Sequence, residues 1–122
     1  MPIIDVELFA NETSAPRADL AHCVADALES VFGAEPGHVW VRLHVNPASL
    51  CAEHSVALAA QDLPTFITVL HASPPEVSAR QAEAVKVCNV LAKCLGCSPE
   101  RVHVEYAPPG RGRMDFGGTL VL

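Results

Sequence analysis

The sequence contains no run of about 18 or more consecutive apolar residues, and no charged segment followed by an apolar stretch opens it. We therefore expect no membrane partner and no secretory signal. Basic residues are also scarce, with 8 Lys and Arg against 14 Asp and Glu and a formal net charge of −6. The densest basic element, Arg111-Gly112-Arg113, is too short for the many phosphate contacts of nonspecific nucleic-acid binding. We expect no nucleic-acid partner either.

The cysteines do not form a metal-binding pattern. They number five, and the single C-x-x-C, Cys94 to Cys97, has no second ligand pair at a spacing that zinc would need. Cys23 and Cys88 fall on apolar stripes of expected helices, where a reduced thiol packs as a small hydrophobe. We expect structural thiols, no metal, no cofactor and a reducing, cytoplasmic location, with a metal or redox role for the C-x-x-C as the alternative.

The most informative feature is an internal repeat. Residues 33–41 and 96–104 both follow the pattern G-x-x-P-x-x-V-x-V and lie 63 residues apart. A chain of 122 residues, half of them apolar, has the length of one domain that buries about two-thirds of its unfolded surface. We expect a single domain, residues 1–122, with repeat one at about 2–46, repeat two at about 65–107 and a C-terminal tail at 108–122.

Each repeat contains an amphipathic helix that ends before its glycine. The first helix carries apolar residues at spacings of three and four, and Gly33 and Gly96 occupy positions where a helix ends in a left-handed residue. The second helix has an expected start at Ser73, with Pro74 at the first helical position and Glu76 at the capping-box position. Its expected apolar stripe comprises Val77, Ala84, Val85, Cys88, Leu91, Ala92 and Leu95.

A strand precedes each helix, at Ile3 to Phe9 and at Phe66 to Ala72. The chain thus reads β-α-β twice, which predicts parallel pairing within each unit. The fold class is α/β, with a four-stranded sheet and both helices on one face. The other face, bearing Val, Trp and Leu, would be left bare, so we expect self-association. The tail, Met114 to Leu122, contains a short apolar strand that would pair with a neighbouring subunit.

The chemistry begins at Met1-Pro2, which runs straight into a strand. Methionine before proline is ordinarily removed, which leaves the Pro2 nitrogen as a terminal secondary amine. A terminal amine ordinarily has a pKa of about 7.7–8.0, and burial lowers the pKa by disfavouring the ammonium form. Such a base would take a proton from a carbon next to a carbonyl group.

Several segments together resemble the tautomerase superfamily over nearly the whole chain. That group includes 4-oxalocrotonate tautomerase, macrophage migration inhibitory factor, 5-carboxymethyl-2-hydroxymuconate isomerase and malonate semialdehyde decarboxylase. The end resembles the decarboxylase branch, where G-R-G-R precedes the tail, and the S-P-E-R-V-H-V run resembles the migration inhibitory factor branch. The segments carrying the resemblance are Pro2, Leu43 to Val45, Leu70 to Ser73, Ser98 to Val104 and Gly110 to Phe116.

The resemblance implies a homotrimer with its sites near subunit interfaces, and it implies that Pro2 is the catalytic base. His103 falls where the migration inhibitory factor branch has a tyrosine contributed by the adjacent subunit, so it would bind substrate; a surface role is the alternative. The backbone of Ala72 and Ser73 matches a substrate-contacting region. Glu105 and Tyr106 are within plausible reach of the same site.

A carboxylate substrate also needs positive charge, and Arg42, Arg111 and Arg113 are the available suppliers. Ion pairing is the alternative role for Arg42. The arginines that the decarboxylase and dehalogenase branches place after the third strand are absent, and His38 replaces the decarboxylase's acidic partner. We therefore expect a cofactor-independent tautomerase or isomerase that acts on a 2-oxo acid or an unsaturated carboxylic acid. The alternatives are a dehalogenase, hydratase or decarboxylase of a small carboxylic acid, and a non-catalytic cytokine-like binding trimer.

Overall fold

The computed structural model describes residues 2–11 and 17–122, so the expected loss of Met1 concerns a residue outside the described part. No helix in these two ranges is both long enough and apolar enough to cross a bilayer. The elements are, in chain order, β1 (Ile3–Ala10), α1 (Leu20–Phe32), β2 (Trp40–Pro47), β3 (Thr65–Leu70), α2 (Val77–Leu95), β4 (Val102–Tyr106), β5 (Asp115–Phe116) and β6 (Thr119–Leu120). Short 3-10 helices occur at η1 (Ala48–Leu50), η2 (Ala60–Asp62) and η3 (Pro99–Arg101).

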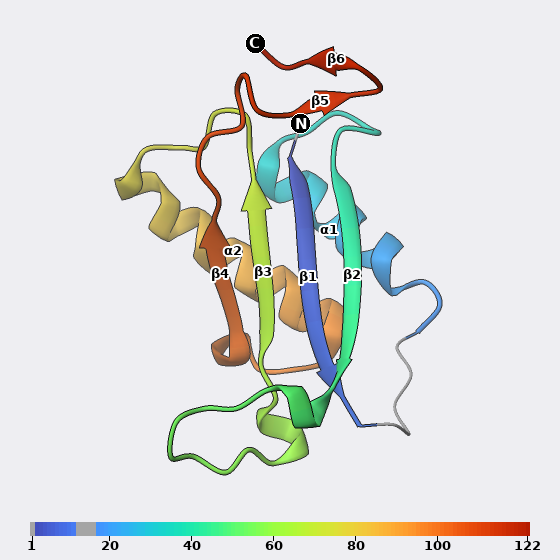
Figure 1. The fold of residues 1–122 in the computed structure, drawn as a ribbon, viewed down its shortest axis with the longest axis vertical. Helices are drawn as coiled ribbons and strands as arrows, with labels where there is room; N and C mark the ends of the chain where they lie inside the picture. The colour runs from blue at the N-terminus through green and yellow to red at the C-terminus, as the bar shows by residue number, and fades with distance from the viewer. Residues whose placement is uncertain (1, 12–16) are drawn as a thin grey trace.

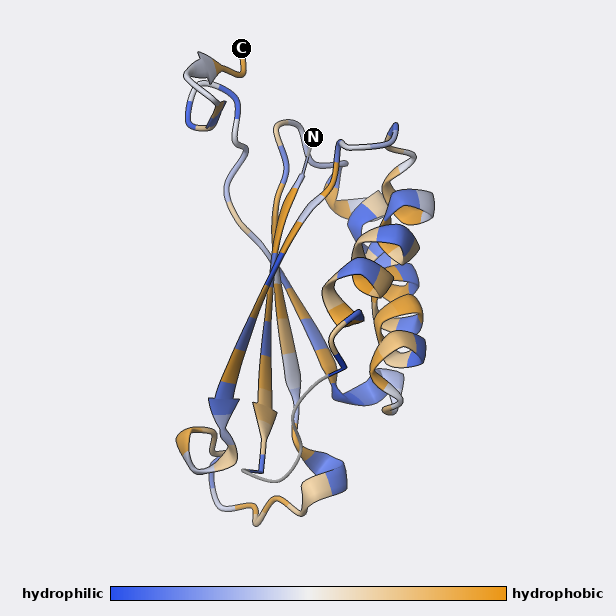
Figure 2. Ribbon diagram, turned by 90° about the vertical axis from the view of Figure 1, so that its right-hand side faces the viewer, coloured by the Kyte–Doolittle hydropathy of each residue, from blue (hydrophilic) through white to orange (hydrophobic). Residues whose placement is uncertain are grey.

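The main sheet has the strand order β2-β1-β3-β4. β1 is parallel to β2 and β3 is parallel to β4, whereas the central strands β1 and β3 are antiparallel. Both helices cover one face of the sheet and leave the other open (Figures 1 and 2). The two parallel β-α-β units and the two-layer arrangement are therefore confirmed.

The core lies between the sheet and the helices. Ile4 and Val6 alternate along β1 and are fully buried, and they meet Val24 and Leu28 of α1. The spacing of four between the two helical residues places them on one face, where they complete the apolar layer. Burial of several such side chains, each contributing about 1.5–3 kcal/mol, holds the helix layer to the sheet.

α1 ends where the sequence predicts. Gly33 is left-handed, with φ of 61°, and its N–H donates to the Glu29 carbonyl oxygen. α2 ends in the same way at Gly96, with φ of 68°. These two glycines confirm the repeat at the level of backbone conformation.

Replacing Gly33 with alanine should destabilise the protein by about 1–2 kcal/mol. No atom lies within 4 Å of the added Cβ, so the loss comes from the left-handed backbone and not from a clash. Chemical denaturation of Gly33→Ala, compared with Ala34→Gly as a control outside the left-handed position, measures the difference. An unchanged free energy of unfolding in Gly33→Ala would contradict this explanation.

The predicted start of the second helix is wrong. α2 begins at Val77, after an N-cap residue, Glu76, that has extended backbone and makes no side-chain capping bond. The reason lies in Pro74 and Pro75, because a residue that precedes proline is disfavoured in the helical region. Ser73 and Pro74 both precede a proline, so the helix begins only after Pro75.

The expected apolar stripe of this helix is partly wrong as well. Val77 and Val85 are exposed, at 73% and 49%, whereas Val87 and Cys94 are buried. Val87, Leu91 and Cys94 follow the spacing of four and three that faces α1 and the sheet. Val85 lies two residues before Val87, nearly on the opposite side of the helix.

The middle of the open face of the sheet is polar, whereas we expected an apolar face. Asp5 lies between Arg42 and Thr68 in register, and Glu7 lies between His44 and Phe66. The alternation along β2 directs Val41 and Leu43 to the helix side instead, where they pack against the core. Trp40 and Phe66 are the large exposed hydrophobic residues on this face.

The C-terminal tail pairs with itself. β5 and β6 are antiparallel, with Asp115 opposite Leu120 and Phe116 opposite Thr119. Between them Gly117 and Gly118 both have positive φ, 63° and 93°, which is what the tightest two-residue hairpin turn requires. The hairpin lies at the same end of the molecule as the start of β1 (Figure 1). The apolar strand expected in the tail is thus one half of an intrachain hairpin.

Candidate functional site

Pro2 lies at the start of β1 and is fully buried. Its carbonyl oxygen accepts a hydrogen bond of 3.1 Å from the Trp40 N–H at the start of β2. Ile3 opposes Leu70 in the antiparallel pair of β1 and β3, so Pro2 and His71 reach the same end of the sheet. The backbone of Pro2 is therefore fixed between β2 and the exit of β3.

His71 follows β3 and is the site residue that the sequence analysis missed. Its ring lies 6.4 Å from the Phe32 ring, centroid to centroid, and its Nδ1 accepts a hydrogen bond of 3.0 Å from the Ser73 N–H. Burial lowers the pKa of His71 below its ordinary value. The imidazole is therefore neutral near pH 7 and carries its proton on Nε2. Only the pairing of β1 with β3 places it opposite Pro2, and a single sequence does not specify that pairing.

The segment after β4 runs beside the exit of β3. The Gly110 N–H donates to the His71 carbonyl oxygen at 2.9 Å, and the Arg111 N–H donates to the Ala72 carbonyl oxygen at 3.3 Å. A side chain at Gly110 would collide with Met114, which is buried. Glycine thus permits the close approach that brings Arg111 to the end of the sheet.

Arg111 is held by two contacts of its side chain. Its Nε donates to the Ser73 Oγ at 2.5 Å, and its Nη1 donates to the Leu122 carbonyl oxygen. The side chain is nevertheless exposed, and Arg113 beyond the Gly112 turn is exposed too. The structure therefore places Pro2, Ala72, Ser73 and Arg111 at one end of the sheet and adds His71 to them, while their roles in a site stay predictions.

Arg42 lies elsewhere and is already paired. On the open face its Nε and Nη2 donate to the two carboxylate oxygens of Asp5 at 2.7 and 2.9 Å. His44 Nε2 lies 3.3 Å from the same carboxylate. Within this chain Arg42 therefore forms an ion pair with Asp5, the alternative role given above, and its predicted role in substrate binding stays a prediction.

The Asp5 pair predicts a pH dependence of stability. Burial disfavours the charged carboxylate, but the hydrogen bonds from Arg42 and His44 outweigh it and lower the pKa of Asp5 below its ordinary value. A depressed pKa stabilises the fold above the unfolded value of about 4, and this contribution is lost as the pH falls through the folded pKa. Denaturation at pH 7 and at pH 3 should therefore show a larger acid loss in the wild type than in Asp5→Asn. Equal losses would contradict the assignment.

His103 lies away from Pro2 within one chain. It is on β4 opposite Phe66, and their rings are 5.4 Å apart, centroid to centroid. Phe66 in turn opposes Glu7 of β1. Glu7 lies four residues beyond Ile3, and at the rise of a strand this separates the two by about 13 Å. The structure therefore does not bring His103 and Pro2 together in a single chain.

The other two polar residues of β4 already have partners. The Tyr106 hydroxyl donates to Glu83 Oε1 of α2 at 2.7 Å, and the Arg80 guanidinium lies over its ring at 5.8 Å. Glu105 Oε1 accepts a hydrogen bond of 3.0 Å from Thr68 on the open face. Tyr106 thus ties β4 to α2, on the helix side of the sheet.

Two cavities of the single chain do not include Pro2. One, of about 910 Å³, lies at the opposite end of the sheet, and another, of about 410 Å³, lies on the open face among Asp5, Glu7 and Glu105. The greater volume of the first cavity does not make it the candidate site, because the proline nitrogen and Arg111 are at the other end. Neither cavity could therefore hold a substrate against Pro2, and a substrate pocket there needs further residues to enclose it.

Comparison with known proteins identifies the fold. No family model matches the sequence, and the search of curated proteins finds no match. The structure is similar to a fused 4-OT symmetric trimer, with a TM-score of 0.76 and 18% identity over 98% of this chain and 94% of that one. It is also similar to macrophage migration inhibitory factor from Oncomelania hupensis, with a TM-score of 0.71 and 16% identity over 99% and 83% of the chains. Malonate semialdehyde decarboxylase gives a TM-score of 0.69 and 18% identity over 94% and 90%.

These structures share one architecture with the chain, and they span three branches of the superfamily that the sequence resembles. The chain therefore has the fold of these tautomerase-superfamily structures, as the resemblance of its sequence implies. At identities of 16–18% the likeness concerns the fold alone.

Proposed function

We propose that the protein is a cofactor-independent tautomerase that moves a proton between oxygen and carbon of a 2-oxo acid or a related unsaturated carboxylic acid. The observation that carries this proposal is the placement of buried Pro2 at the same sheet end as His71, Ser73 and Arg111. The terminal nitrogen, freed by loss of Met1, is the general base. The fold similarity to 4-OT and malonate semialdehyde decarboxylase supports this class of chemistry.

The reaction needs one base and a positive end for the substrate. The unprotonated Pro2 nitrogen takes the enol hydroxyl proton, and the resulting prolinium returns a proton to the neighbouring carbon, which leaves the ketone. Arg111 already donates from Nε to Ser73 and from Nη1 to Leu122, so it binds the carboxylate through Nη2 and the second N–H of Nη1. The neutral His71, with its proton on Nε2, donates a hydrogen bond to the oxygen where negative charge develops.

The active form is a homotrimer with sites at subunit boundaries. Two observations favour assembly: Pro2 is not on the wall of either cavity described above, and His103 is distant from Pro2 within one chain. A neighbouring subunit supplies the missing wall together with its own His103. The trimeric 4-OT structures of the same fold support this arrangement.

Tautomerisation is preferred here to decarboxylation, hydration or dehalogenation. Ser73, Pro74 and Pro75 occupy the positions after β3 where those branches place arginines, which leaves the site with Arg111 and Arg113. The assay follows ketonisation of phenylpyruvate enol by absorbance, beside release of halide or carbon dioxide from three-carbon acids. We expect ketonisation above the buffer rate, with no release of either product. A protein that lacks Met1 and leaves the enol unchanged would refute the proposal.

A further inference from the structure

Two cysteines from different helices meet inside the helix layer. Cys23 of α1 and Cys94 of α2 are 71 residues apart in the sequence, yet their Sγ atoms are 2.7 Å apart. A disulfide bond has a sulfur–sulfur distance of about 2.05 Å, so a small movement of the side chains would join them. Both are thiols in this structure.

The surroundings favour pairing of these two thiols over other pairs. Cys94 is part of the buried core cluster, and Cys23 packs against that cluster. Cys88, on the same helix as Cys94, instead donates to the Val102 carbonyl oxygen at 3.3 Å. The two helices therefore hold Cys23 and Cys94 in contact by their packing, so little further ordering is needed to join them.

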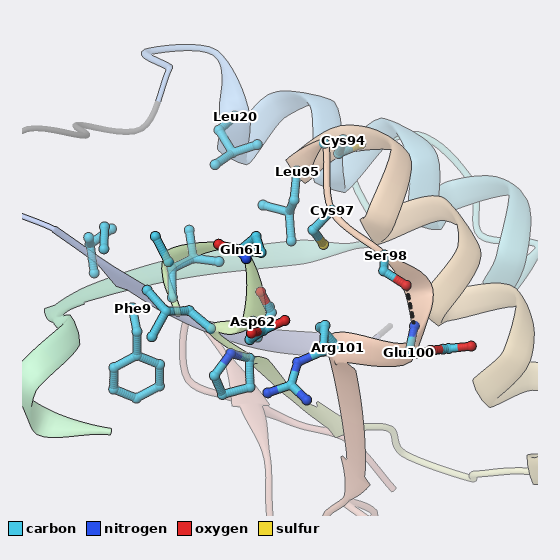
Figure 3. A pocket seen from close by; sticks show the side chains of 18 of the residues that line it. Phe9, Leu20, Gln61, Asp62, Cys94, Leu95, Cys97, Ser98, Glu100 and Arg101 are labelled. Carbon is cyan, nitrogen blue, oxygen red and sulfur yellow. Dashed lines mark hydrogen bonds between the residues drawn. The ribbon is translucent and has the colours of Figure 1, made fainter. Parts of the chain in front are cut away.

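One member of the pair, Cys94, lines the cavity of about 910 Å³ at the end of the sheet opposite Pro2, and this cavity is the side from which we expect a small oxidant to approach. Cys94 and Cys97 lie on its wall, together with Leu20 at the start of α1 and Phe9 near the end of β1 (Figure 3). Cys94 is thus one of the residues that line an open space large enough for a peroxide.

We propose that Cys23 and Cys94 form a reversible disulfide when the protein meets a hydroperoxide. One thiolate attacks the peroxide, the O–O bond breaks, and that sulfur becomes a sulfenic acid. The second sulfur then attacks the first, the S–S bond forms, and the sulfenic oxygen leaves as water. With hydrogen peroxide, two thiols are oxidised and one peroxide is reduced to two waters. A dithiol reductant reverses the bond.

Burial and the contact with Cys23 raise the pKa of Cys94 to about 11. Cys94 is therefore protonated at neutral pH, and only its small thiolate fraction reacts. We expect disulfide formation to be slow at pH 7 and to accelerate as the pH rises towards 9. Because the reaction is slow at pH 7, we expect the disulfide to form only when the exposure to peroxide is sustained.

Peptide mapping of the peroxide-treated protein tests the proposal directly. Trypsin releases Cys23 on residues 18–42 and releases Cys94 and Cys97 together on residues 94–101. We expect the intact protein to lose two hydrogen atoms and the digest to contain these two peptides cross-linked, until a reductant separates them. The disulfide should also raise the melting temperature by on the order of 10 °C.

Cys97→Ala is the matched control, because Cys97 lies on the same cavity wall and the same tryptic peptide. The cross-link should persist in Cys97→Ala and disappear in Cys94→Ala. A Cys94–Cys97 bond, a cross-link that requires Cys97, or no loss of hydrogen from the oxidised wild type would overturn the proposal. The digest of the wild type and of Cys97→Ala decides the question even if Cys94→Ala does not fold.

Discussion

Replacing Pro2 with alanine should lower kcat/KM for enol ketonisation by at least about 100-fold, since general-base catalysis contributes about 10²–10⁴-fold. Alanine leaves a terminal amine after Met1 is removed, but a primary one without the ring that fixes the nitrogen at the start of β1. In the variant, as in the wild type, a small residue follows Met1, so we expect the methionine to be removed from both. The loss therefore reports on the nitrogen itself.

The control for this variant is Ile3→Val, which shortens the next side chain and leaves the Pro2 nitrogen intact. We expect near wild-type activity in Ile3→Val, and both variants should remain folded at the assay temperature, with some loss of melting temperature in Pro2→Ala because Pro2 is buried. Intact mass must show that Met1 is absent from all three proteins. Turnover that survives Pro2→Ala unchanged would show that the Pro2 nitrogen is not the base, whereas no turnover in the wild type without Met1 would favour the non-catalytic binding trimer.

Arg111→Ala should lower kcat/KM by about 10–100-fold, mainly through a higher KM, because a charge-assisted hydrogen bond contributes about 1.5–3 kcal/mol. The side chain also contacts Ser73 and Leu122, so a loss of stability must be separated from a loss of binding. Melting curves report a loss of stability, and a higher KM with little change in kcat reports a loss of substrate binding. Arg111→Lys should recover part of the activity, since it keeps the charge but not the fork.

Arg113→Ala is the matched variant, because Arg113 lies two residues further along the same exposed turn. We expect a smaller effect there, since the Arg111 guanidinium is tied to Ser73 at the exit of β3 and Arg113 lies beyond the Gly112 turn. If Arg113→Ala loses activity and Arg111→Ala does not, the assignment of the substrate arginine is wrong.

The repeated G-x-x-P-x-x-V-x-V segment predicts much of the fold. Gly33 and Gly96 end their helices as expected. Glycine adopts the left-handed conformation that ends a helix without a steric penalty, so the sequence alone indicates where each helix ends. The parallel pairs β1 with β2 and β3 with β4 follow from helical crossovers. Local rules were therefore enough for the four strands of the main sheet, for the ends of the two helices and for the two parallel pairs.

Other features depended on competition between local rules. Ser73 has the sequence of a helix cap, but Pro74 and Pro75 restrict the residues before them, so the helix starts at Val77. Gly117-Gly118 is a signal for a two-residue hairpin, and it turns the tail back on itself. The prediction of a single strand in the tail did not take this turn signal into account.

The site was less predictable than the fold because it depends on register and assembly. His71 becomes a neighbour of Pro2 only through the antiparallel pairing of β1 with β3, which joins the two repeats. The polar open face, with Arg42 on Asp5, likewise follows from which side of β2 faces the helices. The role of His103 depends on a second subunit, whose position one chain does not specify.

The most direct test of the account is a titration of the Pro2 nitrogen in the mature protein, followed by ¹⁵N NMR. We predict that Met1 is absent and that the pKa of this nitrogen lies below the value of about 7.7–8.0 that is typical of an exposed chain terminus. The pH at which kcat/KM reaches half its maximum should match that pKa. A nitrogen that still carries methionine, or that titrates at or above the value of an exposed terminus, would contradict the account.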